Sequence, residues 1–506
     1  MKKCRECQHE ISDNPKICPN CDALRPTKKR WKDWGFEYKS KTTILGIPLV
    51  HISFKYRPNW RPIPAKGIIS IGQFGIGVIN ISQFGIGIIS LSQITIAFYA
   101  LAQVAIAYSL IAQVGLFFNY GYGPNVWDIN ELSVSCKSDP TNQYTYQPPE
   151  NINDGFEVSS LDEVNIDSVL IEEAVNKIRC GNYKEMHSML IFKDDKLVLE
   201  EYFEGHKWKW DGANHHGELV NWDRDMLHNI HSATKSVTSA LIGIAIDEGF
   251  IESVDQSIFD YLPEHQHLKT DGREKITIEH ILTMTSGLQW REWSAPYSSR
   301  DNPAVSIWFQ DKDPITYLLE KPLIDEPGTR FTYSTGNMYV LGEIIRHSSN
   351  MTIDEFSGKY LFEPLGIDST NWPLKFENGV DGNNLEIGAR DMAKIGVTFL
   401  NNGVWNGKQL IPEEWVEKSA TSFPGNQGID VPGEPSGELG YSYTWWTKEY
   451  SDSGKKINMY TASGFGGQHI MVFPELNTVV VFTGGNFVTK RPPFMILEKY
   501  ILPAFD

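Results

Sequence analysis

Between residues 67 and 116 the sequence repeats every ten residues, and this repeat limits the folds open to that part of the chain. One glutamine marks each repeat, at Gln73, Gln83, Gln93, Gln103 and Gln113. Each decade divides into two pentads whose first residue is small and whose third and fifth residues are apolar. A five-residue step turns an α-helix by about 500°, so the pattern makes no stripe along a helix. It favours a β-solenoid-like segment in which the third and fifth residues point inward and the small residues turn the corners.

The repeat lies within a longer stretch, residues 67–127, that contains no Asp, Glu, Lys or Arg. More than 18 uncharged, mostly apolar residues are also typical of transmembrane helices, and two would fit here. The glycines, the β-branched residues and the regular glutamines favour the β-repeat. We therefore expect residues 67–118 to be a β-repeat, with transmembrane helices as the alternative and membrane association open in both cases.

Charge divides the chain into three parts. Residues 1–66 have a net charge of +9, residues 67–127 have none, and residues 128–506 have a net charge of −26. The acidic part should repel nucleic acid, so no nucleic-acid partner is expected. The basic part is either a solvated linker or a surface that faces anionic lipid.

Four of the six cysteines lie close together in two Cys-x-x-Cys pairs, Cys4 with Cys7 and Cys18 with Cys21. Two such pairs can present four thiolates in a tetrahedron, and zinc is the usual occupant. A disulfide pair or a redox site is the alternative. A zinc ribbon requires reduced thiols, so we expect a cytoplasmic N-terminus and a protein that is cytoplasmic or membrane-associated. Cys136 and Cys180 are expected to be free thiols.

Composition and turn signals predict five segments. A zinc ribbon (1–25) precedes a basic linker (26–66), the uncharged repeat (67–118), a proline-containing linker (119–160) and a large globular domain (161–506). The N-terminus leads directly into the cysteines rather than into an apolar stretch, so no secretory signal peptide is expected.

Ser232-Ala233-Thr234-Lys235 begins an apolar helix and sets a hydroxyl and an amine one turn apart. Serine is a poor nucleophile until a base takes its proton, and a lysine of lowered pKa can do so. An ordinary helix N-cap is the alternative for Ser232. The second such tetrad, Ser453-Gly454-Lys455-Lys456, is polar and centred on glycine, which predicts a hairpin turn.

Two further segments fit this chemistry. Tyr333 lies in a turn flanked by glycines, where a phenol held near a lysine ammonium can exist as phenolate and relay the serine proton. The glycine-rich segment from Ala462 to Gln468 precedes a strand, Ile470 to Phe473. Backbone N–H groups of Ser463, Gly464 and Phe465 could approach a substrate carbonyl there and form an oxyanion hole.

From about residue 185 onward the chain resembles the serine β-lactamase-related family, which includes class C β-lactamases, DD-peptidases, esterases and 6-aminohexanoate-dimer hydrolases. The motifs follow the family's order: Ser232 to Lys235, Leu282 to Leu288, Pro327-Gly328 before Tyr333-Ser334-Thr335, Glu363 to Ile367, Ala389 to Lys394, and the Gly464–Phe473 strand. The resemblance implies an α/β, β-lactamase/transpeptidase-like fold with a helical lobe against an antiparallel sheet. It also implies that Ser232 is the acylated nucleophile, Lys235 its activator and Tyr333 the proton relay.

Two departures from the family pattern bear on the substrate. Thr335 replaces the asparagine of the usual Tyr-x-Asn motif, and Ala462-Ser463-Gly464 lacks the cationic first residue of Lys-Thr-Gly or His-x-Gly. In the family that cation helps to bind substrate carboxylates, so the resemblance favours an esterase or amidase for a small molecule over a true β-lactamase. No cofactor is expected for catalysis. The alternative is a binding or sensor protein that keeps the fold without turnover.

Overall fold

The computed structural model describes residues 2–4, 7–12, 15–22, 26–27, 35–57, 60–123, 125–129, 143–373, 384–452 and 455–505. The chain forms two compact units, residues 1–137 and residues 138–506. Each unit is described by itself.

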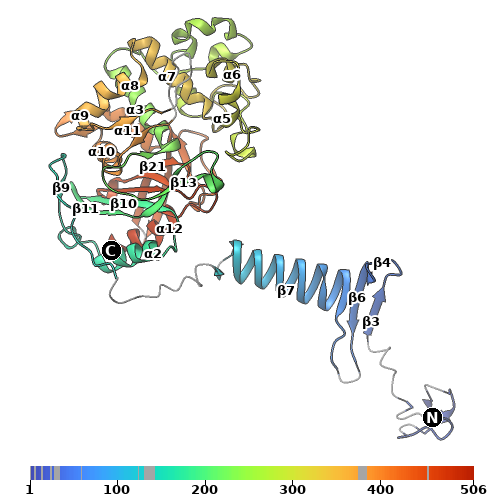
Figure 1. Ribbon diagram of the computed structural model, residues 1–506. Helices are drawn as coiled ribbons and strands as arrows, with labels where there is room; N and C mark the ends of the chain where they lie inside the picture. The colour runs from blue at the N-terminus through green and yellow to red at the C-terminus, as the bar shows by residue number, and fades with distance from the viewer. Residues whose placement is uncertain are drawn as a thin grey trace. The chain divides into compact units, whose positions relative to one another are not determined.

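In unit 1 the uncharged repeat is one long strand, β7 (Ala65–Tyr122), which winds as a coil (Figure 1). Contacts between residues ten apart set one turn of the coil at ten residues. The rings of Phe74 and Phe84 stack at 4.9 Å between centroids, and those of Phe98 and Tyr108 at 4.5 Å. These separations match the spacing of neighbouring strands, ~4.8 Å. The segment is extended backbone throughout, so the alternative of transmembrane helices is wrong here.

The orientation predicted for the pentads is also wrong. The third and fifth residues point outward, as the 43% exposure of Ile76 and the 54% exposure of Ile86 illustrate. The interior is too narrow for them, because a Cβ atom built on Gly75 would lie 1.8 Å from Asn80 Oδ1. Small residues therefore fill most of the inside of the coil, where Leu110 and Phe117 are buried as larger exceptions, and the other large apolar residues cover the outside.

Shorter strands flank the coil, so the predicted linker of residues 26–66 is not all linker. β6 (Val50–Lys55) pairs in parallel with the first turn of β7, and β8 (Asn125–Asp128) pairs in parallel with the last turn. The remaining strands of unit 1 are β3 (Gly35–Lys39), which pairs with β6, the hairpin β4 (Thr43–Ile44) and β5 (Ile47–Pro48), and the N-terminal hairpin β1 (Lys2–Lys3) and β2 (Glu10–Ile11).

Unit 2 is built around one eight-stranded sheet of order β19-β20-β21-β22-β23-β10-β11-β9. The strands are β19 (Gly440–Ser442), β20 (Trp445–Asp452), β21 (Lys455–Gly464), β22 (Gln468–Phe473), β23 (Thr478–Gly484), β10 (Met186–Lys193), β11 (Lys196–Tyr202) and β9 (Glu157–Val158). All neighbours are antiparallel except β9 and β11. β20 and β21 pair up to Asp452 and Lys455; Ser453 and Gly454, the predicted turn, lie outside the described residues.

Both faces of this sheet are covered, as successive residues of β23 show. Val479 and Val481 pack into one hydrophobic cluster with the helical lobe, while Val480 and Phe482 pack into a second with α2 and α12. This alternation follows from the two-residue period of a strand. The helices are α2 (Ser168–Arg179), α3 (Thr234–Asp247), α4 (Ile278–Leu282), α5 (Pro303–Ser306), α6 (Pro314–Leu319), α7 (Gly336–Ser349), α8 (Ile353–Ser357), α9 (Glu363–Leu365), α10 (Ala389–Leu400), α11 (Glu413–Ala420) and α12 (Pro493–Ile496).

The helical lobe and the antiparallel sheet agree with the predicted α/β fold. The compact unit begins earlier than residue 161, because Tyr144 is buried and the Tyr146 hydroxyl donates a 2.7 Å hydrogen bond to the backbone of Val198. None of the described helices of the chain has both the length and the apolar character needed to cross a membrane.

Candidate active site

Ser232 lies immediately before α3, in a short 3-10 turn formed by His231–Ala233. Residues Thr234 to Ala245 of α3 are all buried, so the helix runs through the core and fixes the position of its N-terminus. The turn between β19 and β20 holds this end of the helix in place. Thr444 Oγ1 donates a 3.0 Å hydrogen bond to the carbonyl oxygen of Lys235, and Ser236 Oγ donates a 2.9 Å bond to the carbonyl of Thr444.

Lys235 projects from the first turn of α3 toward Ser232, and its Nζ donates a 2.9 Å hydrogen bond to Ser232 Oγ. The lysine is only 2% exposed. Burial disfavours the charged amine and lowers the pKa of Lys235 to about 8, although Glu292 acts in the opposite direction. At pH 7 about a tenth of the amine is then neutral, which is the form that can accept a proton from the serine, and this fraction rises with pH.

Tyr333 completes the group predicted from the sequence. Its ring packs against both Trp293 and Trp446, with centroids 5.3 and 5.8 Å away, and Lys235 Nζ lies 5.1 Å from its centroid. Burial and the negative charge of Glu292 raise the pKa of the Tyr333 phenol, and a hydrogen bond with Ser232 opposes them. The raised pKa favours the neutral phenol in the resting site, so the role of a Tyr333 phenolate as proton relay stays a prediction.

Glu292 is a site residue that the sequence analysis missed. Its carboxylate is 2% exposed and accepts hydrogen bonds from the Trp290 indole at 2.8 Å, the Tyr297 hydroxyl at 2.8 Å and the Thr335 backbone at 2.7 Å. The Thr335 hydroxyl donates a fourth, at 2.6 Å. The threonine that replaces the usual asparagine is thus directed at a buried carboxylate 43 positions earlier in the sequence. A glutamate in an aromatic loop carries no sequence signal for such a role.

The segment predicted to bind an oxyanion also reaches the site. Ser463, Gly464 and Phe465 line a cavity of about 510 Å³ together with Ser232 and Tyr333. A Cβ atom on Gly464 would lie 2.2 Å from the carbonyl oxygen of Ile230. Glycine therefore allows the end of β21 to approach the chain just before Ser232.

A cation reaches the wall of this cavity from outside the Ala462-Ser463-Gly464 segment, where the family usually has one. Arg491 lines the cavity, and its guanidinium lies 5.3 Å from the centroid of the Phe465 ring. Arg491 Nη1 is 3.2 Å from Glu434 Oε2, and His469 Nε2 is 3.4 Å from Glu434 Oε1. Because Ala462 stands where the family usually has a cationic residue, β21 contributes no cation at this position. Arg491 does line the cavity, but it is already paired with the buried carboxylate of Glu434.

Ser232 also borders a second cavity, of about 470 Å³. Its aromatic lining consists of Trp208, Trp210, Tyr297, Trp308, Phe309, Tyr339 and Phe465. Tyr297 and Phe465 line both cavities, so the candidate nucleophile stands where the two meet. Space on both sides of Ser232 would allow the two parts of a substrate, on either side of a scissile bond, to occupy different cavities.

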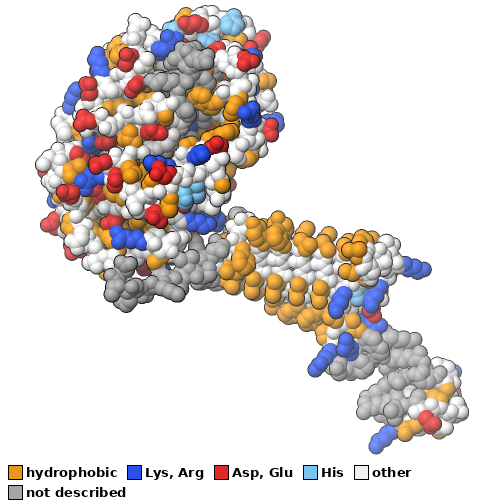
Figure 2. Space-filling view, in the orientation of Figure 1, with side chains coloured by type: hydrophobic (Ala, Val, Ile, Leu, Met, Phe, Trp, Pro, Cys, Tyr) orange, Lys and Arg blue, Asp and Glu red, His pale blue; other side chains and the backbone are white. Residues whose placement is uncertain are grey.

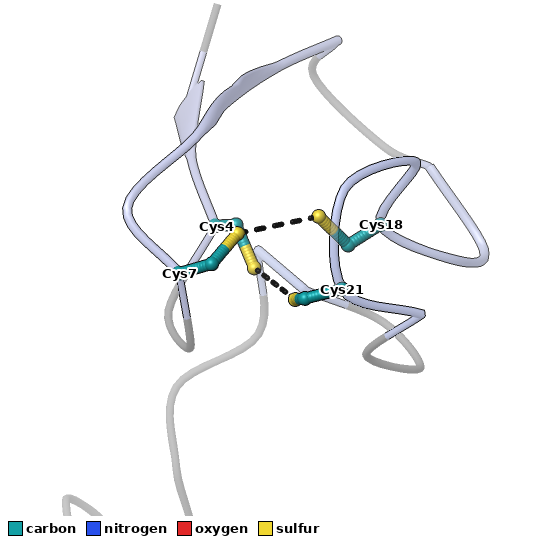
Figure 3. A group of neighbouring side chains, drawn as sticks. All are labelled: Cys4, Cys7, Cys18 and Cys21. Atoms are coloured by element: carbon teal, nitrogen blue, oxygen red, sulfur yellow. Dashed lines mark hydrogen bonds between the residues drawn. The ribbon is translucent and has the colours of Figure 1, made fainter.

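In unit 1 the four predicted zinc ligands converge (Figure 3). The sulfur atoms of Cys4 and Cys21 are 3.7 Å apart, as are those of Cys7 and Cys18, and all four lie within 4.8 Å of one another. A tetrahedral zinc site with Zn–S bonds of about 2.3 Å places its sulfur atoms ~3.8 Å apart. These residues therefore fit a zinc ion. A disulfide, with sulfur atoms ~2.05 Å apart, does not fit.

The remaining cysteines differ from expectation. Cys180 is disulfide-bonded rather than a free thiol. Cys136, the other predicted free thiol, lies outside the described residues.

The chain belongs to the beta-lactamase family, whose family model matches residues 186–493. A 6-aminohexanoate-dimer hydrolase from Paenarthrobacter ureafaciens is 27% identical over 267 residues, which are 51% of this chain and 66% of that protein. The chain spans between about half and two thirds of the length of the curated relatives it matches.

Solved structures agree on the fold of unit 2. A penicillin-binding protein homologue from Caulobacter crescentus has a TM-score of 0.50 and 18% identity, and the match covers 66% of this chain and 96% of that one. A simvastatin synthase from Aspergillus terreus has a TM-score of 0.50 and 15% identity, covering 66% of this chain and 97% of that one. At these identities the likeness shows the β-lactamase/transpeptidase-like fold alone.

Proposed function

We propose that unit 2 is a serine hydrolase that cleaves an ester or amide through an acyl-enzyme. The observation that carries this proposal is the 2.9 Å contact between Lys235 Nζ and Ser232 Oγ in a buried site where the lysine pKa is lowered to about 8. A neutral amine in hydrogen-bond contact with a serine hydroxyl meets the requirements for nucleophile activation.

The neutral amine of Lys235 takes the hydroxyl proton while Ser232 Oγ attacks the carbonyl carbon, which forms the new C–O bond and a tetrahedral oxyanion. Backbone N–H groups of Ser232 and of the Ser463–Phe465 segment are the proposed donors to this oxyanion. The lysine proton then passes through the neutral phenol of Tyr333 to the leaving oxygen or nitrogen, and the bond between carbonyl carbon and leaving group breaks. Water hydrolyses the acyl-Ser232, and no cofactor takes part.

Charge in the cavity supports a neutral ester or amide as substrate. A substrate carboxylate would have to compete with Glu434 for Arg491, since the two are 3.2 Å apart in the resting site. The 6-aminohexanoate-dimer hydrolase among the relatives fits an amide substrate class. A true β-lactam or a peptide with a free C-terminus is a poorer fit.

The test compares the full chain with its Ser232→Ala variant on p-nitrophenyl esters, on anilides and on a chromogenic β-lactam. We expect ester or anilide hydrolysis that is lost in the variant, and mass spectrometry should find the acyl group on Ser232. Val169→Ala, an exposed position on α2, serves as the matched control. Equal rates in the wild type and in Ser232→Ala would refute the proposal. A stable acyl adduct without product release would favour the binding or sensor alternative.

We propose in addition that Cys4, Cys7, Cys18 and Cys21 hold one structural zinc ion. Zinc content of the purified chain should be one ion per molecule, and Cys18→Ser should abolish it while leaving esterase activity unchanged. Retention of zinc in this variant would contradict the assignment.

A further inference from the structure

The coil of β7 has its apolar side chains on the outside, which is the reverse of a water-soluble solenoid. Large hydrophobic residues are between about 40% and 56% exposed along its length, including Phe84, Ile86, Ile96, Leu101 and Ile111. Figure 2 shows rows of such side chains along the coil. Exposed apolar patches of this extent mark an interaction surface. From residue 67 onward the coil has no charged side chain on any face. An element that lies on the surface of a membrane has a charged or polar face toward the water, so the coil does not fit that arrangement.

We propose that the coil of residues 65–122 spans a lipid bilayer, so that the chain enters the bilayer on one side at residue 65 and leaves it on the other at residue 122.

Polar groups within the hydrocarbon core of a bilayer must form their hydrogen bonds inside the protein. The interior of the coil meets this requirement. Asn80 Nδ2 donates to the hydroxyls of Ser90 and Ser92 at 3.0 and 3.1 Å, and Ser70 Oγ donates to Asn80 Oδ1 at 3.0 Å. Thr95 Oγ1 donates to the carbonyl oxygen of Gly85 one turn earlier. At the two ends of the coil, β6 pairs with the first turn and β8 pairs with the last turn.

The length of the coil matches the bilayer. Fifty-eight residues at ten per turn make nearly six turns, and at about 4.8 Å per turn the coil is roughly 28 Å long. The hydrocarbon core of a bilayer is about 30 Å thick. The uncharged stretch, residues 67–127, covers this length and ends just before Asp128.

The two ends of the coil carry the residues expected at a membrane surface. Residues 35–66, next to the first turn, contain six Lys or Arg and one Glu. Trp60 is 75% exposed before the coil, and Tyr122 is 67% exposed at its end. Indole and phenol rings are favoured at the bilayer interface, and basic residues are favoured on its cytoplasmic side.

The redox state of the cysteines differs between the parts of the sequence before and after the coil. Cys4, Cys7, Cys18 and Cys21 form no disulfide, whereas Cys180 is disulfide-bonded. Reduced zinc-binding thiols are typical of the cytosol, and disulfides are typical of compartments outside it. A spanning coil explains how one chain holds both, because residues before 65 and after 122 leave it at opposite ends.

The glutamines at ten-residue intervals are polar side chains on the otherwise largely apolar outer surface of the coil. Amides repeated at the strand spacing can pair along a stack, which limits their cost in hydrocarbon. The same stripe is also where a second copy would pack, so self-association is an outcome that the test must separate from insertion.

The test is cell-free synthesis of the full chain with mixed phosphatidylcholine and phosphatidylglycerol vesicles, followed by flotation and a carbonate wash. We expect the wild type to float and to resist both carbonate and high salt. Protease added outside should then digest one flank of the coil only, and protect the coil together with the other flank. Release by salt or carbonate, digestion of both flanks, or a stable lipid-free oligomer would each overturn the proposal.

Ile86→Lys/Ile96→Lys places two charges at the middle of the coil and should reduce the carbonate-resistant fraction at least about tenfold. Ile152→Lys/Val169→Lys, at exposed apolar positions of unit 2, is the matched control and should float like the wild type. Because the lysine variant could fail to fold, Ile86→Val/Ile96→Val serves as a second comparison that conserves the apolar surface and should insert normally. If the lysine variant is as resistant to carbonate as the wild type, the proposal is wrong.

Discussion

Lys235→Met should make unit 2 more stable while it removes hydrolysis. Methionine keeps the length and apolar stem of the buried lysine and lacks its charge. Burial lowers the pKa of Lys235 from 10.5 to about 8, which at about 1.36 kcal/mol per unit costs the folded state about 3 kcal/mol at neutral pH. The group is completely buried, so solvent screening does not reduce this figure. Losing the hydrogen bond to Ser232 costs about 1 kcal/mol, leaving a net gain of about 2 kcal/mol.

The sign of the pH dependence follows from proton binding. Between about pH 8 and pH 10.5 the unfolded lysine is protonated and the folded one is neutral, so the unfolded state binds more protons and wild-type stability rises with pH. The variant lacks this contribution. Its advantage over the wild type should therefore be full at pH 7 and should disappear as the pH passes through 10.5.

Urea unfolding followed by tryptophan fluorescence at pH 7 and pH 10.5 measures both stabilities. Ester hydrolysis should fall by about 10²- to 10⁴-fold, the usual contribution of a general base. The reasoning is refuted if Lys235→Met is less stable than the wild type at pH 7, or if the difference does not change with pH.

Lys394→Met is the matched control. Lys394 is also 2% exposed and lies on a helix, α10, but its Nζ contacts the carbonyl oxygen of Gly366 at 2.8 Å and Asp391 Oδ1 at 3.0 Å. Removing this lysine leaves the carbonyl oxygen of Gly366 without its donor and the Asp391 carboxylate, whose side chain is 21% exposed, without its cation, so the variant should lose about 2 kcal/mol. The two lysines should thus respond in opposite directions to the same substitution.

Three further results are expected. Wild-type kcat/KM should rise with pH through about 8, because Lys235 acts as a base only when neutral. Glu292→Gln should move this rise to lower pH, since the carboxylate raises the lysine pKa, and should reduce the free energy of unfolding by about 2 kcal/mol through weakened hydrogen bonds. Gly85→Val should lose protection of coil amides from hydrogen exchange, because a Cβ atom there would lie 1.7 Å from Asn80 Nδ2. The outward Gln83→Val should keep that protection.

The contact between Ser232 and Lys235 could be predicted because the two residues are neighbours on one helical turn, where spacing in sequence fixes spacing in space. Tyr333 followed from its turn and from the family's motif order. Glu292 and Arg491 could not be predicted in the same way. Glu292 meets Thr335 across 43 residues, and Arg491 meets Glu434 across 57. Such contacts depend on how the sheet and the helical lobe pack, which no local pattern encodes.

For the repeat, the ten-residue period predicts extended backbone correctly, but the predicted inward orientation of the large apolar side chains is wrong. Ten-residue spacing predicts extended backbone, and the expectation that large apolar residues point inward rests on burial from water. The narrow interior of the coil prevents this, since a Cβ atom built at position 75 would lie 1.8 Å from the buried Asn80 Oδ1. Side-chain volume therefore decides which residues face inward. The width of the interior, which sets the volume allowed, cannot be derived from composition alone.

The coil can change length only in whole turns. Each turn contacts the turns before and after it, so an insertion or deletion of ten residues adds or removes one layer and leaves every other contact in register. A deletion of five residues would join half-turns that differ, and the glutamine at position 93 would then stack on Val78 instead of on Gln83. We expect natural length variation in this segment to occur in tens, each changing the span by about 4.8 Å. The length of the coil would then change in evolution by whole ten-residue turns rather than by single residues.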